Sequence, residues 1–304
     1  MSRDIPPDEP REAPGGNTDP RKMEEAIRER DREISRASLG HSSRPLERPT
    51  DTQRPPIPFV DGVAVLYDRE RGYRLTENQI SAITELGKFR VIAAYNLAQH
   101  AYKGQLQLAQ SDMEYLISRG LARRSSFEGP EAIPRELLTL TRRGHRLLRA
   151  NVLVPRDQAV YHGFVKPNEA NHDADLYRLY QKEAERIRSE GGTNVRVVLD
   201  YELKRKINRD IARFGTEARL EIAERYGLKV VRNKIPVPDL RIEYETRDGE
   251  MARVNLELVT EHYRRRSLGE KVRAGFRLFA LRGEADHLRR VLDRQELTAE
   301  ILSL

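Results

Sequence analysis

The chain of 304 residues contains no cysteine. This absence excludes disulfide bonds and zinc sites built from cysteine ligands, and it fits a reducing compartment. No apolar run approaches the roughly 18 residues that a membrane span requires, and the first residues carry no apolar signal core. We therefore expect a cytoplasmic protein without membrane contacts.

Several catalytic signatures are also missing. The chain has no Walker A, GxSxG or kinase motif. Three histidines (His162, His172 and His262) lack the spacing of metal ligands, so we do not expect a zinc site, and His172 is expected to pack at or cap a helix. The formal net charge of +7 favours polyanionic partners. Charged residues of both signs make up 34% of the chain, so charge alone does not establish DNA binding.

A helix, a hairpin and a second helix are predicted between residues 103 and 150. The first helix covers residues 105–119, where apolar residues recur at helical spacing from Leu106 to Ile117, and Gly120 can end it. Two short strands follow, and Thr141 then caps the last helix. The predicted strands cover residues 121–124 and 137–141.

Two more helices are predicted upstream. Thr76 and Gln79 have the spacing of a capping box and open a helix that continues to Leu86. An alanine-rich helix over residues 92–102 follows. Three helices and a hairpin in this order resemble the winged helix-turn-helix fold, with residues 105–119 as the recognition helix. The predicted winged-helix domain covers residues 57–150, with an apolar strand or anchor at residues 57–67.

The predicted recognition helix and hairpin carry candidate DNA-binding residues. Amide and hydroxyl groups on the exposed side of the helix can hydrogen-bond to bases or phosphates, and arginines flank the hairpin, where a wing would meet the phosphate backbone. The predicted partner is therefore double-stranded DNA. The alternative is a winged helix used for protein contacts or for forming a homodimer. The candidates are Gln105, Gln107, Gln110, Ser111, Tyr115, Arg119, Arg123 and Arg124.

The remaining chain divides into three parts. Residues 1–56 are rich in proline and charge and are expected to be a disordered tail, with a segment at 22–35 that becomes helical on a protein partner. Residues 151–171 form a linker. Residues 172–304 form a second domain, whose element order predicts an α+β protein.

The expected elements of the second domain begin with a long helix at 173–190 and a β-branched strand at 195–203. A charged helix over 205–225, interrupted near Gly215, and a short strand at 228–231 come next. Two strands at 239–245 and 252–260 form a hairpin around Asp248-Gly249. Ser267 caps a helix that reaches Phe279, and one or two more helices, without a further strand, fill residues 284–304.

Four charged residues of this domain are candidates for catalysis: Glu202, Asp239, Glu257 and Lys271. Asp239 opens one strand and Glu257 lies in the next, and neighbouring strands are about 5 Å apart, so these carboxylates can converge on a divalent metal. Bound Mg²⁺ or Mn²⁺ would activate water and stabilise charge on a phosphoryl group. The structural alternative is that Glu202 pairs with an arginine and that Asp239 caps the strand turn.

Pro238-Asp239 and Glu257-Leu258-Val259 resemble the PD-(D/E)xK nuclease motif, with Val259 in place of the motif's lysine. The resemblance implies a mixed α/β, restriction-endonuclease-like domain. Lys271 or Lys204 would then supply the displaced lysine from another element.

A longer pattern joins the two domains. It consists of the segments LTENQISAITELGKFR and LTRRGHRLL, then His172, Glu202-Leu203-Lys204, Pro238-Asp239 and the acidic strand at Glu257. This order resembles the replication-relaxation family of mobile elements and plasmids, which pairs a winged helix with a degenerate nuclease-like domain. The resemblance implies a DNA-binding protein of a replication or transfer system, and because Val259 replaces the lysine of the nuclease motif we expect this protein to be non-catalytic. The alternatives are a metal-dependent endonuclease targeted by the winged helix and a protein-interaction adaptor.

Overall fold

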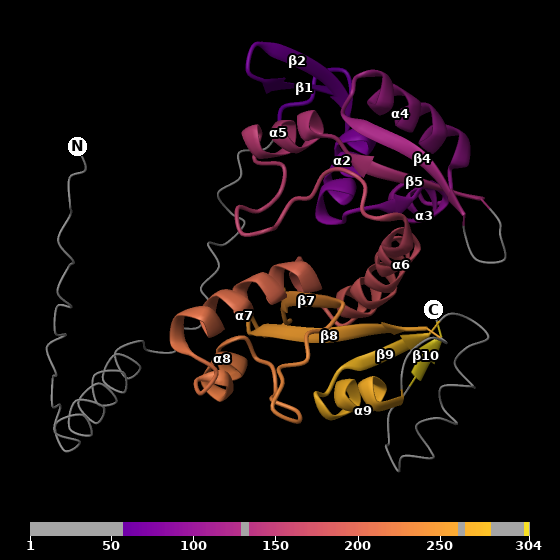
Figure 1. Cartoon of the computed structure of the whole chain (residues 1–304). Coiled ribbons are helices and arrows are strands. Elements are labelled where there is room, and N and C mark those ends of the chain that lie inside the picture. Colours follow the sequence, from indigo (N-terminus) through magenta and orange to yellow (C-terminus); the bar gives the residue numbers. More distant parts are fainter. Residues whose placement is uncertain (1–56, 129–133, 261–264, 281–300, 304) are drawn as a thin grey trace, which may run out of the picture. The chain divides into compact units, whose positions relative to one another are not determined.

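The computed structural model describes residues 57–128, 134–260, 265–280 and 301–303. Over these residues the chain is a mixed α+β protein with three sheets (Figure 1). The predictions of a disordered tail at 1–56, of a partner-bound helix at 22–35 and of helices at 284–300 lie outside the described residues. Within the described ranges, no helix combines the length and apolarity needed to cross a membrane.

The first described elements are an antiparallel hairpin and a capped helix. The hairpin joins β1 (Val63–Asp68) to β2 (Arg71–Thr76), a strand that was not predicted from the sequence. Thr76 ends the hairpin and caps α2 (Glu77–Lys88). Its hydroxyl accepts a hydrogen bond from the Gln79 amide, and the Gln79 side chain accepts one from the Thr76 amide. The predicted capping box is therefore confirmed.

Helices and a three-stranded sheet fill the stretch up to residue 150. The strand order in the sheet is β3-β5-β4, and both pairings are antiparallel. Gly120 has a φ of +68° just after α4, the left-handed conformation that favours glycine at a helix end. The Thr141 hydroxyl accepts a hydrogen bond from the Gly144 amide, which confirms the predicted cap. The elements are β3 (Ile92–Ala93), α3 (Ala94–Ala101), α4 (Leu106–Ser118), β4 (Ala122–Glu128), β5 (Pro134–Leu140) and α5 (Arg142–Ala150).

The long helix α6 (Pro167–Ser189) packs against elements from both parts of the sequence. It contacts β3 and, farther along the chain, β7 and β8. The rings of Tyr177 and Tyr180 lie 5.2 and 5.3 Å from the ring of Phe89, which follows α2. One cluster of buried apolar residues therefore runs from Ala64 to Phe279.

A mixed five-stranded sheet forms the rest of the molecule, in the order β10-β9-β8-β7-β6 (Figure 1). Pairings among β6, β7 and β8 are antiparallel, whereas β9 is parallel to β8 and β10 is parallel to β9. Helices α7 and α8 connect β6 to β7, and α9 connects β8 to β9. The bounds are β6 (Thr193–Leu199), α7 (Asp200–Phe214), α8 (Arg219–Arg225), β7 (Leu240–Glu245), β8 (Met251–Val259), α9 (Arg265–Arg273), β9 (Arg277–Ala280) and β10 (Ile301–Ser303).

Four element predictions for this part are wrong. The strand expected over 195–203 ends at Leu199, so Glu202 lies on α7. Residues 228–231 form only an isolated bridge, between Val231 and Lys234. The helix expected to reach Phe279 ends at Arg273, and Phe279 belongs to β9, because burial in the sheet outweighs the helical spacing of the phenylalanines. Residues 301–303, expected to be helical, form β10.

Candidate nucleic-acid interface and carboxylate site

The predicted DNA-binding residues lie on one side of α4 and on β4. Ala109, Met113 and Leu116 are buried on the inner side of α4 together with Asp112, so the polar residues on the opposite side of the helix face solvent. Leu106, expected to be buried, is instead 51% exposed, and Leu108 beside it is also exposed. Apolar side chains on such a face can contact thymine methyl groups. The exposed candidates are Gln105, Gln107, Gln110, Ser111, Arg119, Arg123 and Arg124.

Tyr115 differs from the other candidates because it is half-buried. Its hydroxyl donates a hydrogen bond to the Arg74 carbonyl at 2.9 Å, and the Arg119 guanidinium lies 5.0 Å from its ring centre. Tyr115 therefore helps to hold α4 against the β1–β2 hairpin and positions Arg119. On β4, Arg124 forms an exposed ion pair with Glu136 at 3.4 Å. Because exposed ion pairs contribute little to stability, Arg124 could release Glu136 and bind a DNA phosphate instead at little energetic cost.

The carboxylates of Asp239 and Glu257 lie side by side, as the sequence analysis expected. The antiparallel register of β7 and β8 pairs Leu240 with Leu256, so Asp239, which precedes Leu240, lies opposite Glu257, which follows Leu256. The Asp239 amide donates a hydrogen bond to Glu257 Oε2 at 3.2 Å, and the Leu258 amide donates one to Asp239 Oδ2 at 3.0 Å. Glu257 is completely buried. This arrangement fixes both carboxylates through the backbone of the neighbouring strand.

Two cationic side chains face these carboxylates. From α9, Lys271 Nζ lies 2.7 Å from Glu257 Oε1 and donates a hydrogen bond to the Val237 carbonyl. From the first turns of α6, His172 Nε2 lies 3.4 Å from Asp239 Oδ2. Of the two lysines proposed for this position, Lys271 lies there, whereas Lys204 pairs with Asp200 at 2.6 Å.

His172 is a cation at neutral pH. Burial lowers the pKa of His172, but hydrogen bonds to Asp173 and Asp239, together with their negative charges, outweigh burial and raise its pKa to about 10. Asp173 is in turn held by Arg90, whose Nε lies 2.6 Å from Asp173 Oδ2. From its sequence position, His172 is expected only to pack at or cap its helix, and nothing points to Arg90. The contacts of His172 with Asp239 and of Arg90 with Asp173 join residues that are distant in sequence.

The donor set does not fit a divalent metal. Both oxygens of Glu257 already have donors, the Lys271 ammonium and the Asp239 amide. Asp239 Oδ2 has the Leu258 amide and the His172 imidazolium. Among the described residues, no three or more His, Asp or Glu side chains are grouped so that they could hold a metal ion. Two carboxylates already balanced by two cations leave little charge to attract Mg²⁺ or Mn²⁺.

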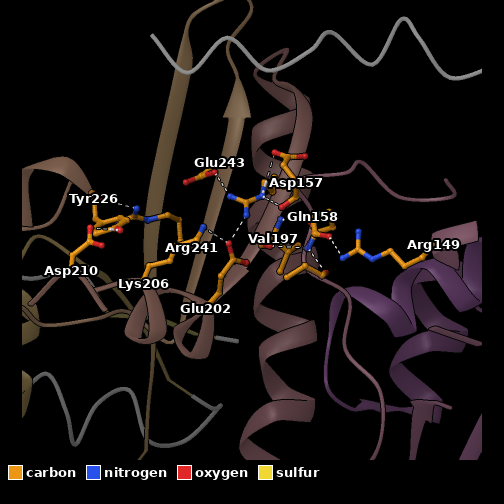
Figure 2. A network of polar contacts seen from close by, with 12 residues as sticks. Arg149, Asp157, Gln158, Val197, Glu202, Lys206, Asp210, Tyr226, Arg241 and Glu243 are labelled. Carbon is orange, nitrogen blue, oxygen red and sulfur yellow. Dashed lines mark hydrogen bonds and ion pairs between the residues drawn. The ribbon is translucent and has the colours of Figure 1, made fainter. Parts of the chain in front are cut away.

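Glu202 belongs to a different network (Figure 2). Its Oε1 lies 2.5 Å from Arg196 Nη2 and 2.6 Å from Lys206 Nζ. Arg196, which is buried on β6, also pairs with Glu243 at 2.7 Å. Among the described residues, Glu202 thus compensates a buried arginine, as the structural alternative proposed, and its contacts do not place it with Asp239 and Glu257.

The same network ties the segment before α6 to the edge of the sheet (Figure 2). Gln158, which is 1% exposed, accepts a hydrogen bond from the Val197 amide at 2.9 Å and donates one to the Val197 carbonyl at 3.0 Å. Arg149 at the end of α5 donates to the Gln158 carbonyl. This part of the predicted linker is therefore packed against β6, whereas the last residues assigned to the linker, from Pro167, belong to α6. No local sequence signal marks Gln158.

The two sites offer different chemistry. The outer side of α4 and β4 presents amides and arginines to solvent, whereas the pair formed by Asp239 and Glu257 is charge-balanced within the protein. Comparisons of the chain with protein-family models, curated proteins and solved structures found no match.

Proposed function

We propose that this chain is a non-catalytic DNA-binding protein in which residues 57–150 act as a winged helix. The observation that carries the proposal is that α4, whose exposed side carries amides, packs against β4, which carries exposed arginines. Helix α4 runs through Gly120 directly into the β4–β5 hairpin, so one surface combines groups suited to base edges with groups suited to phosphates.

The order of elements in the other part supports a restriction-endonuclease-like core. This part begins with helix α6, which is followed by the antiparallel strands β6, β7 and β8. Helix α9 then leads to β9, which is parallel to β8, and helices α7 and α8 are inserted between β6 and β7. Together with the proposed winged helix, this order supports the resemblance to the replication-relaxation family. We therefore propose a role in the replication or transfer of a mobile element or plasmid.

The proposal of a non-catalytic site depends on the two cations. Lys271 and His172 neutralise the carboxylates that a nuclease would use to hold its metal. The second candidate function, a metal-dependent endonuclease, is favoured by one observation, the position of Lys271 beside Glu257, which supplies the lysine that Val259 replaces in the motif.

DNA binding can be tested with the full chain and fluorescent duplexes of several sequences. Replacing Arg123 and Arg124 by alanine should weaken binding to all of them and reduce the slope of log affinity against log salt by about 2, because about 0.9 is lost for each phosphate contact. Gln107→Ala and Gln110→Ala should instead reduce differences between sequences. Arg69→Ala with Arg71→Ala is the charge-matched control. If the wild type binds no duplex at low salt, the proposal is wrong.

The absence of cleavage can be tested with supercoiled plasmid and Mn²⁺. We expect no nicking by the wild type. Mn²⁺-dependent nicking that both Asp239→Asn and Glu257→Gln abolish would establish the endonuclease instead. Thermal unfolding of each variant is the control for folding.

A further inference from the structure

The solvent side of α7 carries basic residues and no acidic residue. We call this set the α7 face: Tyr201, Lys204, Arg205, Asn208, Arg209, Ala212 and Arg213, all exposed. The opposite side of the helix is buried and includes Leu203 and Ile207. The spacing of three and four residues places the exposed residues in one stripe along the helix.

Of the three acidic residues of α7, Glu202 and Asp210 are buried and neutralised by partners on other elements or on the inner side of the helix, whereas the half-buried Asp200 pairs with Lys204 of the α7 face. Glu202 pairs with Arg196 and Lys206, as described above. Asp210 accepts a hydrogen bond from the Tyr226 hydroxyl at 2.8 Å and pairs with Arg225 at 3.2 Å. Because these partners compensate the carboxylates, the positive charge on the exposed side is only weakly balanced from within the helix.

Individual contacts leave the arginines of the α7 face accessible. Lys204 is paired with Asp200. Arg209 lies 3.5 Å from Asp210, but its side chain is 73% exposed, so this pair is weak in water. Arg205, Arg209 and Arg213 follow each other at four-residue intervals, about 6 Å apart along the helix axis.

An ordinary solvated helix surface on this protein looks different. The exposed end of α6 alternates between the two signs, with Lys182, Glu185 and Arg188 in the helix and Glu190 at its C-cap. A mixed surface suits solubility, whereas a stripe of one sign attracts a polyanion. The α7 face also begins beside the carboxylate site, where the Asp200 amide donates a hydrogen bond to the Asp239 carbonyl at 3.1 Å.

From this charge complementarity we infer that the α7 face binds the phosphate backbone of duplex DNA, as a second contact surface separate from α4 and β4. The inference rests on the proposed DNA binding but assigns part of it to another element. Each arginine in a row along a rigid helix can displace a counterion from one phosphate of the DNA backbone. Such contacts do not depend on the base sequence.

The test compares three variants of the full chain by fluorescence anisotropy with a mixed-sequence duplex at several salt concentrations. The α7 variant combines Arg205→Gln, Arg209→Gln and Arg213→Gln, since glutamine has nearly the helix propensity of arginine. The wing variant combines Arg123→Ala and Arg124→Ala. The control combines Arg69→Gln, Arg71→Gln and Arg188→Gln, three exposed arginines outside both surfaces. Circular dichroism verifies that each variant is folded.

The α7 variant should bind on the order of 10²-fold more weakly near 0.1 M salt, with the salt slope reduced by about 2.7, while the control stays close to the wild type. Equal affinities of the α7 variant and the wild type, or an equal loss in the control, would overturn the inference. If only the wing variant loses affinity, the proposed function stands without this inference. If only the α7 variant does, the inference stands and the winged-helix interface is wrong. A wild type that binds no duplex overturns both.

Discussion

At the residue scale, His172 is one of the two cations that balance the carboxylate pair, and it does so through Asp239. Its imidazolium lies between Asp173 and Asp239, and Arg90 compensates Asp173 from the other side. If the side chain at this position were neutral, the negative charge of Asp239 would lose its nearest cation. The ionic state of His172 should therefore appear in the stability of the protein.

His172→Gln should lower the melting temperature most at acidic to neutral pH. The folded-state pKa of about 10 exceeds the ordinary value of 6.5, so the stabilisation is fully present below about pH 6.5 and is lost as the pH rises towards 10. Because the side chain is 36% exposed, solvent screening limits the effect, and we expect a difference of roughly a few degrees at pH 6. Thermal scans from pH 6 to 10 measure it, with the exposed His162→Gln as the control. A difference that grows with pH would contradict this assignment.

The carboxylate pair could be predicted from sequence, whereas its cationic partners could be predicted only in part. Asp239 and Glu257 lie on strands joined by a recognisable turn, so their proximity follows from local pairing. Lys271 was one of two lysines that the sequence left open. The ion pair of His172 joins residues 67 positions apart, and nothing local encodes such a contact.

At the scale of elements, the correct predictions coincide with strong local signals. Thr76 and Thr141 cap helices, and Gly249, with a φ of +81°, lies in the turn between β7 and β8. The wrong predictions concern segments whose secondary structure depends on pairing with strands distant in sequence. Helix α7 begins at Asp200, directly after a β-branched run that predicted a longer strand. Strand β9 forms because it pairs in parallel with β8, a long-range contact that the local sequence does not encode.

Gly144→Ala should destabilise the contact between α5 and the β4–β5 hairpin. An added Cβ would collide with the Leu121 carbonyl oxygen and lie 2.9 Å from two side-chain carbons of Leu140. The Leu121 carbonyl cannot move freely, because it accepts a hydrogen bond from the Thr141 amide. Overpacking of this kind costs about 1–3 kcal/mol.

Urea unfolding measures the change in the free energy of unfolding for Gly144→Ala. Arg142→Ala, at an exposed position of the same helix, is the control and should be nearly neutral because alanine favours helices. Equal stability of the glycine variant and the wild type would show that α5 shifts away from the hairpin at little cost.

At the scale of the whole described molecule, α6 joins parts that the sequence analysis assigned to two domains. Phe89 packs on Tyr177 and Tyr180, Arg135 pairs with Asp175 at 2.9 Å, and Gln158 binds the edge of the sheet. Composition and residue spacing predicted a linker between two domains at residues 151–171. They do not show how much apolar surface the two parts bury against each other. From this shared core we expect residues 57–128 and 134–260 to unfold as one cooperative unit.

Phe89→Ala tests this cooperativity because Phe89 is buried between α2 and α6 but lies far in sequence from the five-stranded sheet. Truncating a buried phenylalanine costs about 3–5 kcal/mol. If unfolding is cooperative, hydrogen exchange followed by mass spectrometry should speed up by a similar factor in α2 and in β7 and β8, since slow amides exchange through global unfolding. Phe214→Ala, at a side chain that is 45% exposed, is the control and should change exchange little. Faster exchange confined to residues 57–150 would show instead that the two parts unfold independently despite their common core.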